Sequence, residues 1–335
     1  MVFFFVLLVI FQSIPSNGLL NTSSGIYLGR TIKYRNIFVE QYLGIEYARI
    51  ARRFDRAQAI HRDGNHSIIN ATTFGSICKP TISVCANNTN ACSVSYGIFT
   101  SKFSADEQCL YLNVFLPKTN DETKKSIFMW IHGGSSQIGT GNLFDGTVLA
   151  ALGNVIVVTF NFRLNLFGFL SSGDERLEGN LGLYDQSLVL DWIYANSDAL
   201  GGDQQRITIG GHSAGAPHAY YLAKSRFNQG RIRRLILQSG CPLNIWSHIQ
   251  ASQAMDRFHV IVQDNQCGMM GTFEEKVQCL REKDYPLIVE HEYHAYTSAN
   301  HTNVVMHGDL MSGFQENGSL PDVDILIGAN DDEGR

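Results

Sequence analysis

The chain has 335 residues, of which 44% are apolar and 31 are glycine, and its formal net charge is −5. This length allows one large α/β domain or two small ones with ample material for a core, and the composition excludes a disordered chain. The negative charge gives no electrostatic reason to expect nucleic acid or an acidic membrane surface as a partner.

Residues 1–18 predict a secretory signal peptide. Residues 2–11 are an unbroken apolar run, too short to span a bilayer comfortably, and small and polar residues follow it up to Gly18. An uncleaved anchor is the alternative, and no second hydrophobic span follows. We therefore expect a secreted, extracellular protein with no transmembrane span after cleavage. Six Asn-x-Ser/Thr sequons support secretion and predict glycosylation, at Asn21, Asn65, Asn70, Asn87, Asn300 and Asn317.

In an oxidising compartment the cysteines predict disulfide bonds. The chain has seven, at Cys78, Cys85, Cys92, Cys109, Cys241, Cys267 and Cys279. Cys267 and Cys279 flank a short polar segment and predict a local bridge, and Cys78 and Cys109 bracket a loop that contains two more. Because the total is odd, at least one thiol is free or pairs with another chain. Cys241, within an apolar stretch, is the candidate for a buried and unreactive thiol.

The order of hydrophobic segments predicts an α/β protein. Alternation at 25–34 and 37–45 predicts antiparallel edge strands, and a buried strand at 109–115 is expected to end at Pro117. Helical periodicity at 187–195 predicts a helix with Trp192 in the core. The pattern at 267–295 predicts charged helical segments. Further buried strands are predicted at 126–131, 155–161, 206–209, 234–238 and 324–328. Strands alternating with helices indicate one mostly parallel sheet with helices on both faces, and ligands at the carboxyl ends of its strands.

One stretch has the pattern of a nucleophile elbow. A β-branched run, residues 206–209, stops at paired glycines, Ser213 follows between Gly211 and Gly215, and residues 216–224 predict a helix. Gly-x-Ser-x-Gly between a strand and a helix places a serine hydroxyl above a sheet. The alternative is a plain strand-to-helix turn.

A serine hydroxyl becomes a nucleophile only with a base and with N–H donors for the oxyanion. The glycine turn at 133–134 ends a neighbouring strand, and the N–H of Ala214 would be its partner donor; an ordinary glycine turn is the alternative. Glu333 could orient a histidine in the chain order serine, acid, histidine, but none of the eleven histidines follows Glu333. His212 is interpreted as a pocket wall and His218 as structural.

A second cluster of histidines does not predict a metal site. His291 and His294 stand in His-Glu-Tyr-His, which lacks the spacing of the zinc motif His-Glu-x-x-His. We therefore expect no metal and no cofactor.

These motifs together resemble the type-B carboxylesterase/cholinesterase family of α/β-hydrolases, almost from Gly25 to Arg335. The matching segments are EQCLYLNV at 107–114, GNLGLYDQ at 179–186, GGD at 201–203, GHSAG at 211–215, LQSG at 237–240 and NDDEG at 330–334. The resemblance implies an α/β-hydrolase domain over 19–335. It also implies that the C-terminal part of that domain, with the triad histidine, lies beyond the last residue, so we expect an incomplete chain.

The resemblance also implies residue roles. Ser213 would be the nucleophile and Glu333 the triad acid, and the oxyanion donors would be the N–H groups of Gly134, Ser135 and Ala214. The implied disulfides are Cys78–Cys109 and Cys267–Cys279, with Cys85 and Cys92 as an extra local pair. Arg53 and Glu107 match a family ion pair, and Trp246 falls at an acyl-pocket position. Two departures are Ser135, in place of a third glycine, and His212, in place of Glu or Gln.

The sequence thus predicts a secreted serine carboxylesterase that hydrolyses a small-molecule carboxylic ester through an acyl-enzyme, with a Ser-Glu-His triad whose histidine is absent from this chain. The alternative is a non-catalytic cholinesterase-like binding or adhesion protein, or an inactive truncated form. Ser213 and Glu333 favour the enzyme, and the missing histidine favours the alternative. The sequence does not predict an oligomeric state or the physiological ester.

Overall fold

The structure is a computed structural model that describes residues 12–14, 18–62, 67–79, 102–119, 123–244, 246–285, 288 and 322–330. Glu333 lies outside these residues, as do Cys85, Cys92 and the histidines at 291 and 294. The apolar run 2–11 of the predicted signal peptide also lies outside them. Residues 12–14 of that predicted segment form a strand, β1.

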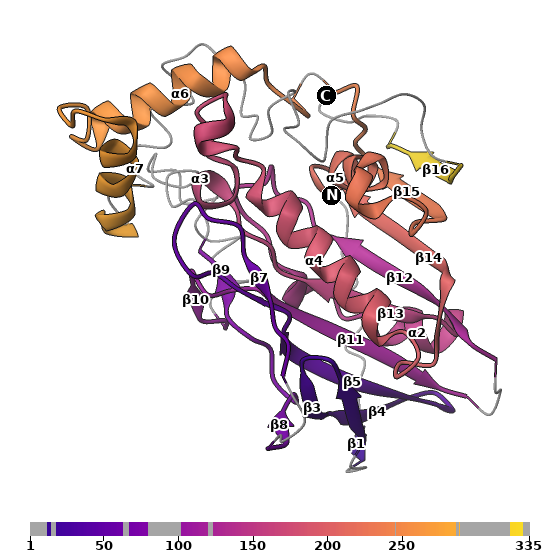
Figure 1. The fold of residues 1–335 in the computed structure, drawn as a ribbon. Coiled ribbons are helices and arrows are strands. Elements are labelled where there is room, and N and C mark those ends of the chain that lie inside the picture. The colour runs from indigo at the N-terminus through magenta and orange to yellow at the C-terminus, as the bar shows by residue number, and fades with distance from the viewer. Residues whose placement is uncertain are drawn as a thin grey trace, which may run out of the picture.

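The centre of the molecule is a nine-stranded sheet with the order β1-β4-β5-β11-β13-β12-β14-β15-β16 (Figure 1). The strands from β13 to β16 in that order pair in parallel, and the strands from β1 to β11 form an antiparallel edge that joins β13. Their bounds are β1 Gln12–Ile14, β4 Arg30–Tyr34, β5 Ile37–Glu46, β11 Tyr111–Lys118, β12 Lys125–Ile131, β13 Ile156–Phe160, β14 Gly202–His212, β15 Arg234–Gln238 and β16 Asp324–Gly328.

Smaller elements surround this sheet. Three small sheets comprise β2 Leu19–Thr22, β3 Gly25–Leu28 and β8 Ile69–Asn70, then β6 Ala48–Arg49 with β7 Gln58–Ala59, and β9 Ile77–Cys78 with β10 Ala105–Asp106. The α-helices are α2 Thr147–Gly153, α3 Asn165–Phe169, α4 Leu181–Asn196, α5 Gly215–Lys224, α6 Ala251–Asp264 and α7 Phe273–Glu282. Short 3₁₀ helices are η2 Gly141–Leu143, η3 Glu175–Leu177 and η4 Arg226–Asn228.

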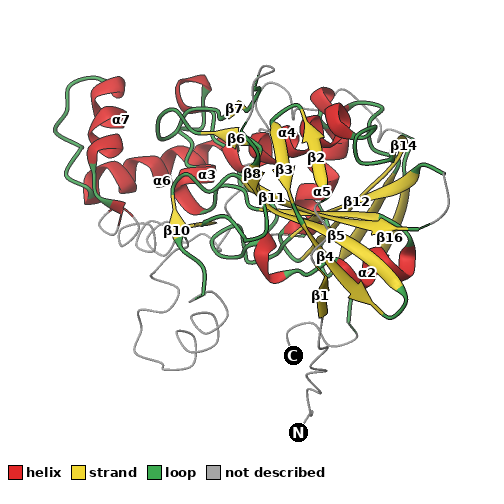
Figure 2. Cartoon of the chain, turned by 90° about the horizontal axis from the view of Figure 1, so that it is seen from below, coloured by secondary structure: helices red, strands yellow, loops and turns green. Residues whose placement is uncertain are grey.

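Alternate side chains of the strands point to opposite faces, and a helix layer covers each face (Figure 2). Val114 of β11 belongs to the large core beneath α4 and α5, whereas the next residue, Phe115, packs with Ala150 and Ala151 of α2 on the other face. Strand β13 is buried at every position and reads as a nearly continuous apolar run, whereas its neighbour β12 alternates between buried and half-buried residues. The α/β-hydrolase fold and the two helical layers are thus confirmed.

Two predicted boundaries were wrong. Pro117 does not end its strand, because β11 runs to Lys118 and Pro117 pairs with Val39 of β5. The pairing of β11 with β13 stops at Phe115, so at Pro117 the strand has a neighbour on one side only, where a residue without an N–H donor is tolerated. Helix α4 begins at Leu181, six residues before the predicted start. Its first turns carry polar side chains, which are buried because tertiary partners satisfy them.

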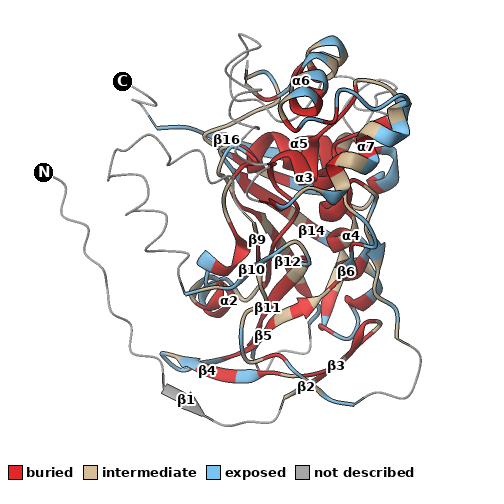
Figure 3. Ribbon diagram, turned by 90° about the vertical axis from the view of Figure 1, so that its left-hand side faces the viewer, coloured by how far each residue is buried: buried red, intermediate tan, exposed pale blue. Residues whose placement is uncertain are grey.

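The last described strand differs from the predicted buried strand. All five residues of β16 are exposed, including Ile325, Leu326 and Ile327 (Figure 3). Its partner β15 keeps Leu235 and Leu237 buried. Strand β16 therefore pairs in parallel with β15, as predicted, but it is much less buried than β15.

Helices α6 and α7 form a separate layer at one end of the sheet (Figure 1). Phe258 and Ile261 of α6 pack with Val277 and Leu280 of α7. The predicted bridge Cys267–Cys279 is present and joins the end of α6 to α7. Within the described residues, no helix is long and apolar enough to cross a membrane.

Candidate active site

Ser213 sits on a sharp turn between β14 and α5, as the motif predicts. Its φ is 52°, in the left-handed region that a residue with a Cβ adopts only when the surroundings impose it. The Ser213 N–H donates to the Gln238 carbonyl oxygen of the adjacent strand at 2.8 Å, and the Ala216 N–H donates to the Ser213 carbonyl at 3.0 Å. These bonds fix the turn between two neighbouring parallel strands.

The glycines on either side of Ser213 allow this turn to close. A Cβ on Gly211 would overlap the backbone carbonyl of Gly215, and a Cβ on Gly215 would overlap the carbonyl oxygen of Ile131. Both neighbours are backbone atoms and cannot move aside. The Gly-x-Ser-x-Gly pattern is therefore required by backbone contact at both glycines.

The turn after β12 lies directly beside the elbow. A Cβ on Gly133 would come within 2.7 Å of the His212 carbonyl oxygen and 3.1 Å of Ser213 Cβ. The next residue, Gly134, has a φ of 116°, and its carbonyl accepts from the N–H groups of the residues at 137 and 138. Ser135 has a φ of 55°, so the serine that replaces a third glycine occupies a left-handed conformation with its side chain exposed. The turn predicted to bind an oxyanion therefore meets the elbow.

Ala214, the third predicted oxyanion residue, is buried and is the N-cap residue of α5. The first N–H groups of a helix have no partner within the helix, which suits them to bind a negative charge. Whether the N–H groups of Gly134, Ser135 and Ala214 converge on one oxyanion stays a prediction.

His218 of α5 contacts the glycine turn that follows β12. This contact was not predicted from the sequence. Its Nε2 lies 3.0 Å from Ser136 Oγ and its Nδ1 lies 2.8 Å from Gln186 Nε2 of α4. All three side chains are buried. Burial, with a smaller effect from His132, lowers the pKa of His218 to about 3. The prediction that His218 is structural agrees with this geometry, whereas nothing in the sequence indicated its partners Ser136 and Gln186.

A second buried histidine, His132, lies under the same turn. Its ring stacks on Phe162 at 4.5 Å and its Nδ1 lies 2.8 Å from the Gly133 carbonyl oxygen. Burial lowers the pKa of His132 to about 4, although the hydrogen bond to Gly133 acts in the opposite direction. Both buried imidazoles are therefore neutral near pH 7.

Neither of these histidines is paired with Ser213. In the part of the chain that the structure describes, no hydrogen bond joins the Ser213 hydroxyl to a histidine. His212 is exposed and directly precedes the serine. Because Glu333 lies outside the described residues, the triad acid and base stay predictions.

The region that leads from the sheet to α6 holds the predicted acyl-pocket residue. Trp246 is half-buried and packs against Ile249 and Ala254, at the start of α6. This contact places the indole on a described element, and its role against a substrate stays a prediction.

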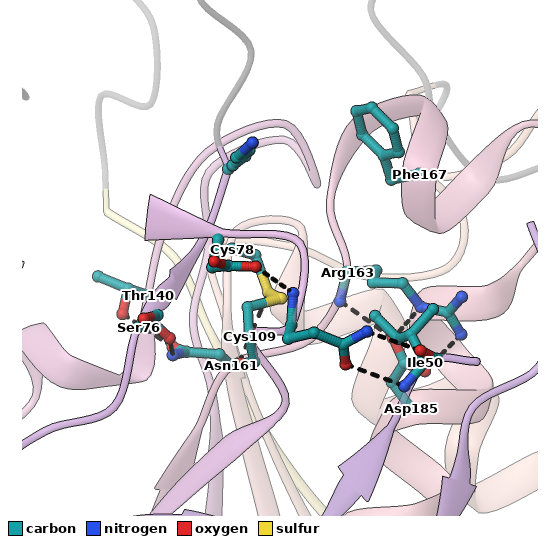
Figure 4. The surroundings of a disulfide bond; sticks show 12 residues. Ile50, Ser76, Cys78, Cys109, Thr140, Asn161, Arg163, Phe167 and Asp185 are labelled. Carbon is teal, nitrogen blue, oxygen red and sulfur yellow. Dashed lines mark hydrogen bonds and ion pairs between the residues drawn. A yellow bond between two sulfur atoms is a disulfide. The ribbon is translucent and has the colours of Figure 1, made fainter. Parts of the chain in front are cut away.

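The predicted Cys78–Cys109 bridge is present and joins the end of β9 to the residues just before β11 (Figure 4). Asn161 Nδ2 donates to the Ser76 carbonyl at 3.0 Å, and Thr140 Oγ1 donates to Asn161 Oδ1 at 2.8 Å, so polar side chains tie the bridge to the sheet. Cys241 is free and half-buried, rather than fully buried as predicted.

The predicted family ion pair is also present. Arg53 Nη2 and Glu107 Oε1 lie 2.5 Å apart, and Arg53 Nε donates to the other carboxylate oxygen at 2.7 Å. Arg53 also donates to the backbone carbonyls of Arg281 and Lys283, beside α7. The pair therefore links the segment between β10 and Cys109 to the α6–α7 layer.

Two of the six predicted glycosylation sites fall on described residues. Asn21 and Asn70 are both exposed. Asn65, Asn87, Asn300 and Asn317 lie outside the described residues. A search of the described residues finds no cluster of three acidic, His or Cys side chains that could hold a metal ion.

The fold and this elbow define a class, the α/β-hydrolases. The family model described as "Carboxylesterase family" matches residues 16–335. The chain therefore belongs to the carboxylesterase family.

Among curated proteins, the chain is similar to neuroligins. It is 32% identical to mouse (Mus musculus) neuroligin-3 over 333 residues, which are 88% of this chain and 39% of that protein. It is 36% identical to neuroligin-2 of mouse and of human (Homo sapiens) over 252 residues, which are 68% of this chain and 30% of those proteins. The chain thus spans well under half the length of these relatives.

Proposed function

We propose that this protein is a non-catalytic binding or adhesion protein built on the carboxylesterase fold. The observation that carries the proposal is the similarity to neuroligin-3 along 333 residues, because that relative and the neuroligin-2 proteins have names that designate no hydrolytic activity. The partner would be a protein, and the carboxylesterase scaffold would supply the binding surface.

The histidines beneath the elbow support a binding role. A general base needs a pKa near the working pH and must reach the proton that it removes. His218 contacts Ser136 and Gln186, and its pKa is lowered to about 3. His132 contacts Gly133 with a pKa of about 4. These imidazoles hold the turn, and neither is suited to activate Ser213.

An extracellular location fits this role. The two disulfides require an oxidising compartment, and the sequons at Asn21 and Asn70 are exposed to modification. We therefore propose a protein that enters the secretory pathway, carries N-linked glycans and meets its partner outside the cell.

Beads coated with the full chain would test the adhesive function. We expect them to adhere to cells from the source organism, and to lose adhesion when surface proteins are removed from those cells by protease. Beads coated with Ser213→Ala should adhere equally, since the hydroxyl is not used. Adhesion no greater than that of beads coated with an unrelated glycoprotein would contradict the proposal.

The second candidate is a serine carboxylesterase, and the conformation of Ser213 favours it. A serine held at φ 52° beside the Gly133 turn is the geometry that nucleophilic attack on an ester needs. In this mechanism Ser213 attacks the carbonyl carbon and Glu333 orients a histidine base. The base takes the hydroxyl proton and passes it to the alcohol, which leaves as the ester C–O bond breaks. The N–H groups at 134, 135 and 214 receive the oxyanion, and water then hydrolyses the acyl-enzyme, which releases the acid and restores the Ser213 hydroxyl.

Hydrolysis of p-nitrophenyl acetate separates the two candidates. For the adhesion protein we expect the full chain and Ser213→Ala to give the same rate, far below the kcat/KM of about 10⁴ M⁻¹s⁻¹ at the lower end for enzymes. Covalent labelling by a fluorophosphonate should also be absent. Turnover and labelling that both disappear in Ser213→Ala would establish the esterase instead.

A further inference from the structure

A pocket with a volume of about 400 Å³ lies between helix α4 and the N-terminal segments of the chain. Neither candidate function uses it. Its walls come from the β2–β3 turn at Ser23, from β7 and the residues after it, and from one side of α4. This volume falls near the small end of the range for ligand sites, about 300–1,000 Å³, so it suits one small molecule.

The inner wall of the pocket is fixed before any ligand arrives. Trp192 and Tyr47 line it and are almost fully buried. Trp192 Nε1 donates to Ser24 Oγ at 2.9 Å, and the Ser23 N–H donates to Asn196 Oδ1 at 2.7 Å. These bonds hold the β2–β3 turn against α4, so little conformational entropy is lost when a ligand binds.

The rim of the pocket carries two opposite charges side by side. Asp191 of α4 pairs with Arg231 Nη1, and the guanidinium lies 5.2 Å from the centre of the Tyr194 ring. The side chains stay accessible, at 48% for Asp191 and 34% for Arg231. An arginine has five N–H donors and a carboxylate has about four acceptor positions, so the pair leaves capacity on both groups. The other titratable side chains that line the pocket are those of His61, Tyr47 and Tyr194.

We infer that this pocket binds a free zwitterionic amino acid with an apolar side chain. Its ammonium group would meet Asp191, its carboxylate would meet Arg231, and its side chain would contact Leu188, Ile60 and Trp192. A ligand with a single charge suits the rim less well, because the rim group of like sign would repel it at short range. A neutral ligand would remove water from both charged side chains without offering either of them a charged partner.

Tryptophan fluorescence of the full chain provides the test, because the chain has only three tryptophans and Trp192 forms a wall of the pocket. The probes are L-phenylalanine and L-leucine, compared with phenylalaninamide, 3-phenylpropionate and N-acetyl-phenylalaninamide. We expect saturable changes with the two amino acids that disappear in Trp192→Phe. Each analogue, lacking one or both charges, should bind at least about ten-fold more weakly.

Matched variants test whether Asp191 and Arg231 bind the charged groups of the ligand. Asp191→Asn and Arg231→Gln should each weaken L-phenylalanine binding at least about ten-fold, because each leaves one ligand charge unpaired. Arg233→Gln is the control: this nearby arginine is exposed, donates to Gln205 and does not line the pocket. Equal circular dichroism spectra would confirm that all three variants fold.

Three results would overturn the inference. They are no saturable change with either amino acid, equal affinity for phenylalaninamide, and unchanged affinity in Arg231→Gln. Since the pocket contains no residue of the elbow and the adhesion test does not depend on an amino-acid ligand, failure of the inference would leave the proposed function untouched.

Discussion

The two ends of helix α4 each carry an Asp–Arg ion pair, and the two pairs differ in their exposure to solvent. Near its start, Asp185 is fully buried and pairs with Arg163, whose side chain is 4% exposed. Two turns later, Asp191 makes the same kind of contact with Arg231 in the open. Figure 4 shows the side chains of this first pair facing each other. The buried pair ties α4 to the segment after β13, whereas the exposed pair keeps both of its charges in contact with solvent.

The largest effect is expected at the buried end. Arg163 makes three hydrogen bonds to the Asp185 carboxylate, two of them from its guanidinium. Asp185→Asn keeps the shape but leaves that guanidinium buried without a counter-charge. We expect the free energy of unfolding, measured by urea denaturation, to fall by about 3–5 kcal/mol. A loss under about 1 kcal/mol would mean that the buried end tolerates an unpaired charge as the exposed end does.

Lowering the pH should also reduce the free energy of unfolding, by a smaller amount, through two buried histidines. The pKa values of His132 and His218, about 4 and about 3, lie below the value near 6.5 of an unfolded histidine. Between these values the unfolded chain binds more protons, so the free energy of unfolding is greatest above about pH 6.5 and falls as the pH drops towards 4. Urea denaturation across this pH range checks the slope.

Two substitutions sharpen this pH test. His218→Gln, which can keep contacts to Ser136 and Gln186, should flatten the slope because one buried titrating group is gone. His259→Gln, at an exposed position on α6, is the control and should leave the slope unchanged. A slope that His218→Gln does not alter would show that the buried histidines do not cause the acid sensitivity.

The smallest effect is expected at the exposed end of α4. Asp191→Asn removes a solvent-screened ion pair, so the free energy of unfolding should change by less than about 1 kcal/mol. Any loss should shrink further at high salt, which screens exposed charges. Urea denaturation at two salt concentrations measures it. A salt-independent loss above about 2 kcal/mol would remove the contrast between the two ends.

The comparison also explains where sequence interpretation succeeded. The elbow at Ser213 was predictable because its Gly-x-Ser-x-Gly pattern is short, and the close approach of Gly211 to the Gly215 backbone lies within it; the contact that requires Gly215, with Ile131, is visible only in the structure. The central strands were predictable because burial on both faces produces continuous apolar runs. The disulfides and the Arg53–Glu107 pair followed from the resemblance to a known family, and the structure confirms them.

The errors have a common cause. The start of α4 was missed because Asp185 and Gln186 are polar, and a helix that packs on a sheet is expected to be apolar there. The structure supplies their partners, Arg163 and His218, from 22 and 32 residues away in the chain. Pro117 was misjudged for a similar reason, because a strand end cannot be located without knowing which neighbour the proline faces.

The sequence by itself predicted most central strands along the chain and the serine at the strand-to-helix turn, because local spacing and hydrophobic period encode them; the family followed from the resemblance of its motifs. Only the tertiary structure decided which polar residues are buried with partners and which stay in water. It showed that His218 contacts the turn beside Ser213, that β16 is exposed to solvent, and that Asp191 and Arg231 lie at the rim of a pocket. These outcomes depend on contacts between segments far apart in the chain, and a one-dimensional pattern does not specify such contacts.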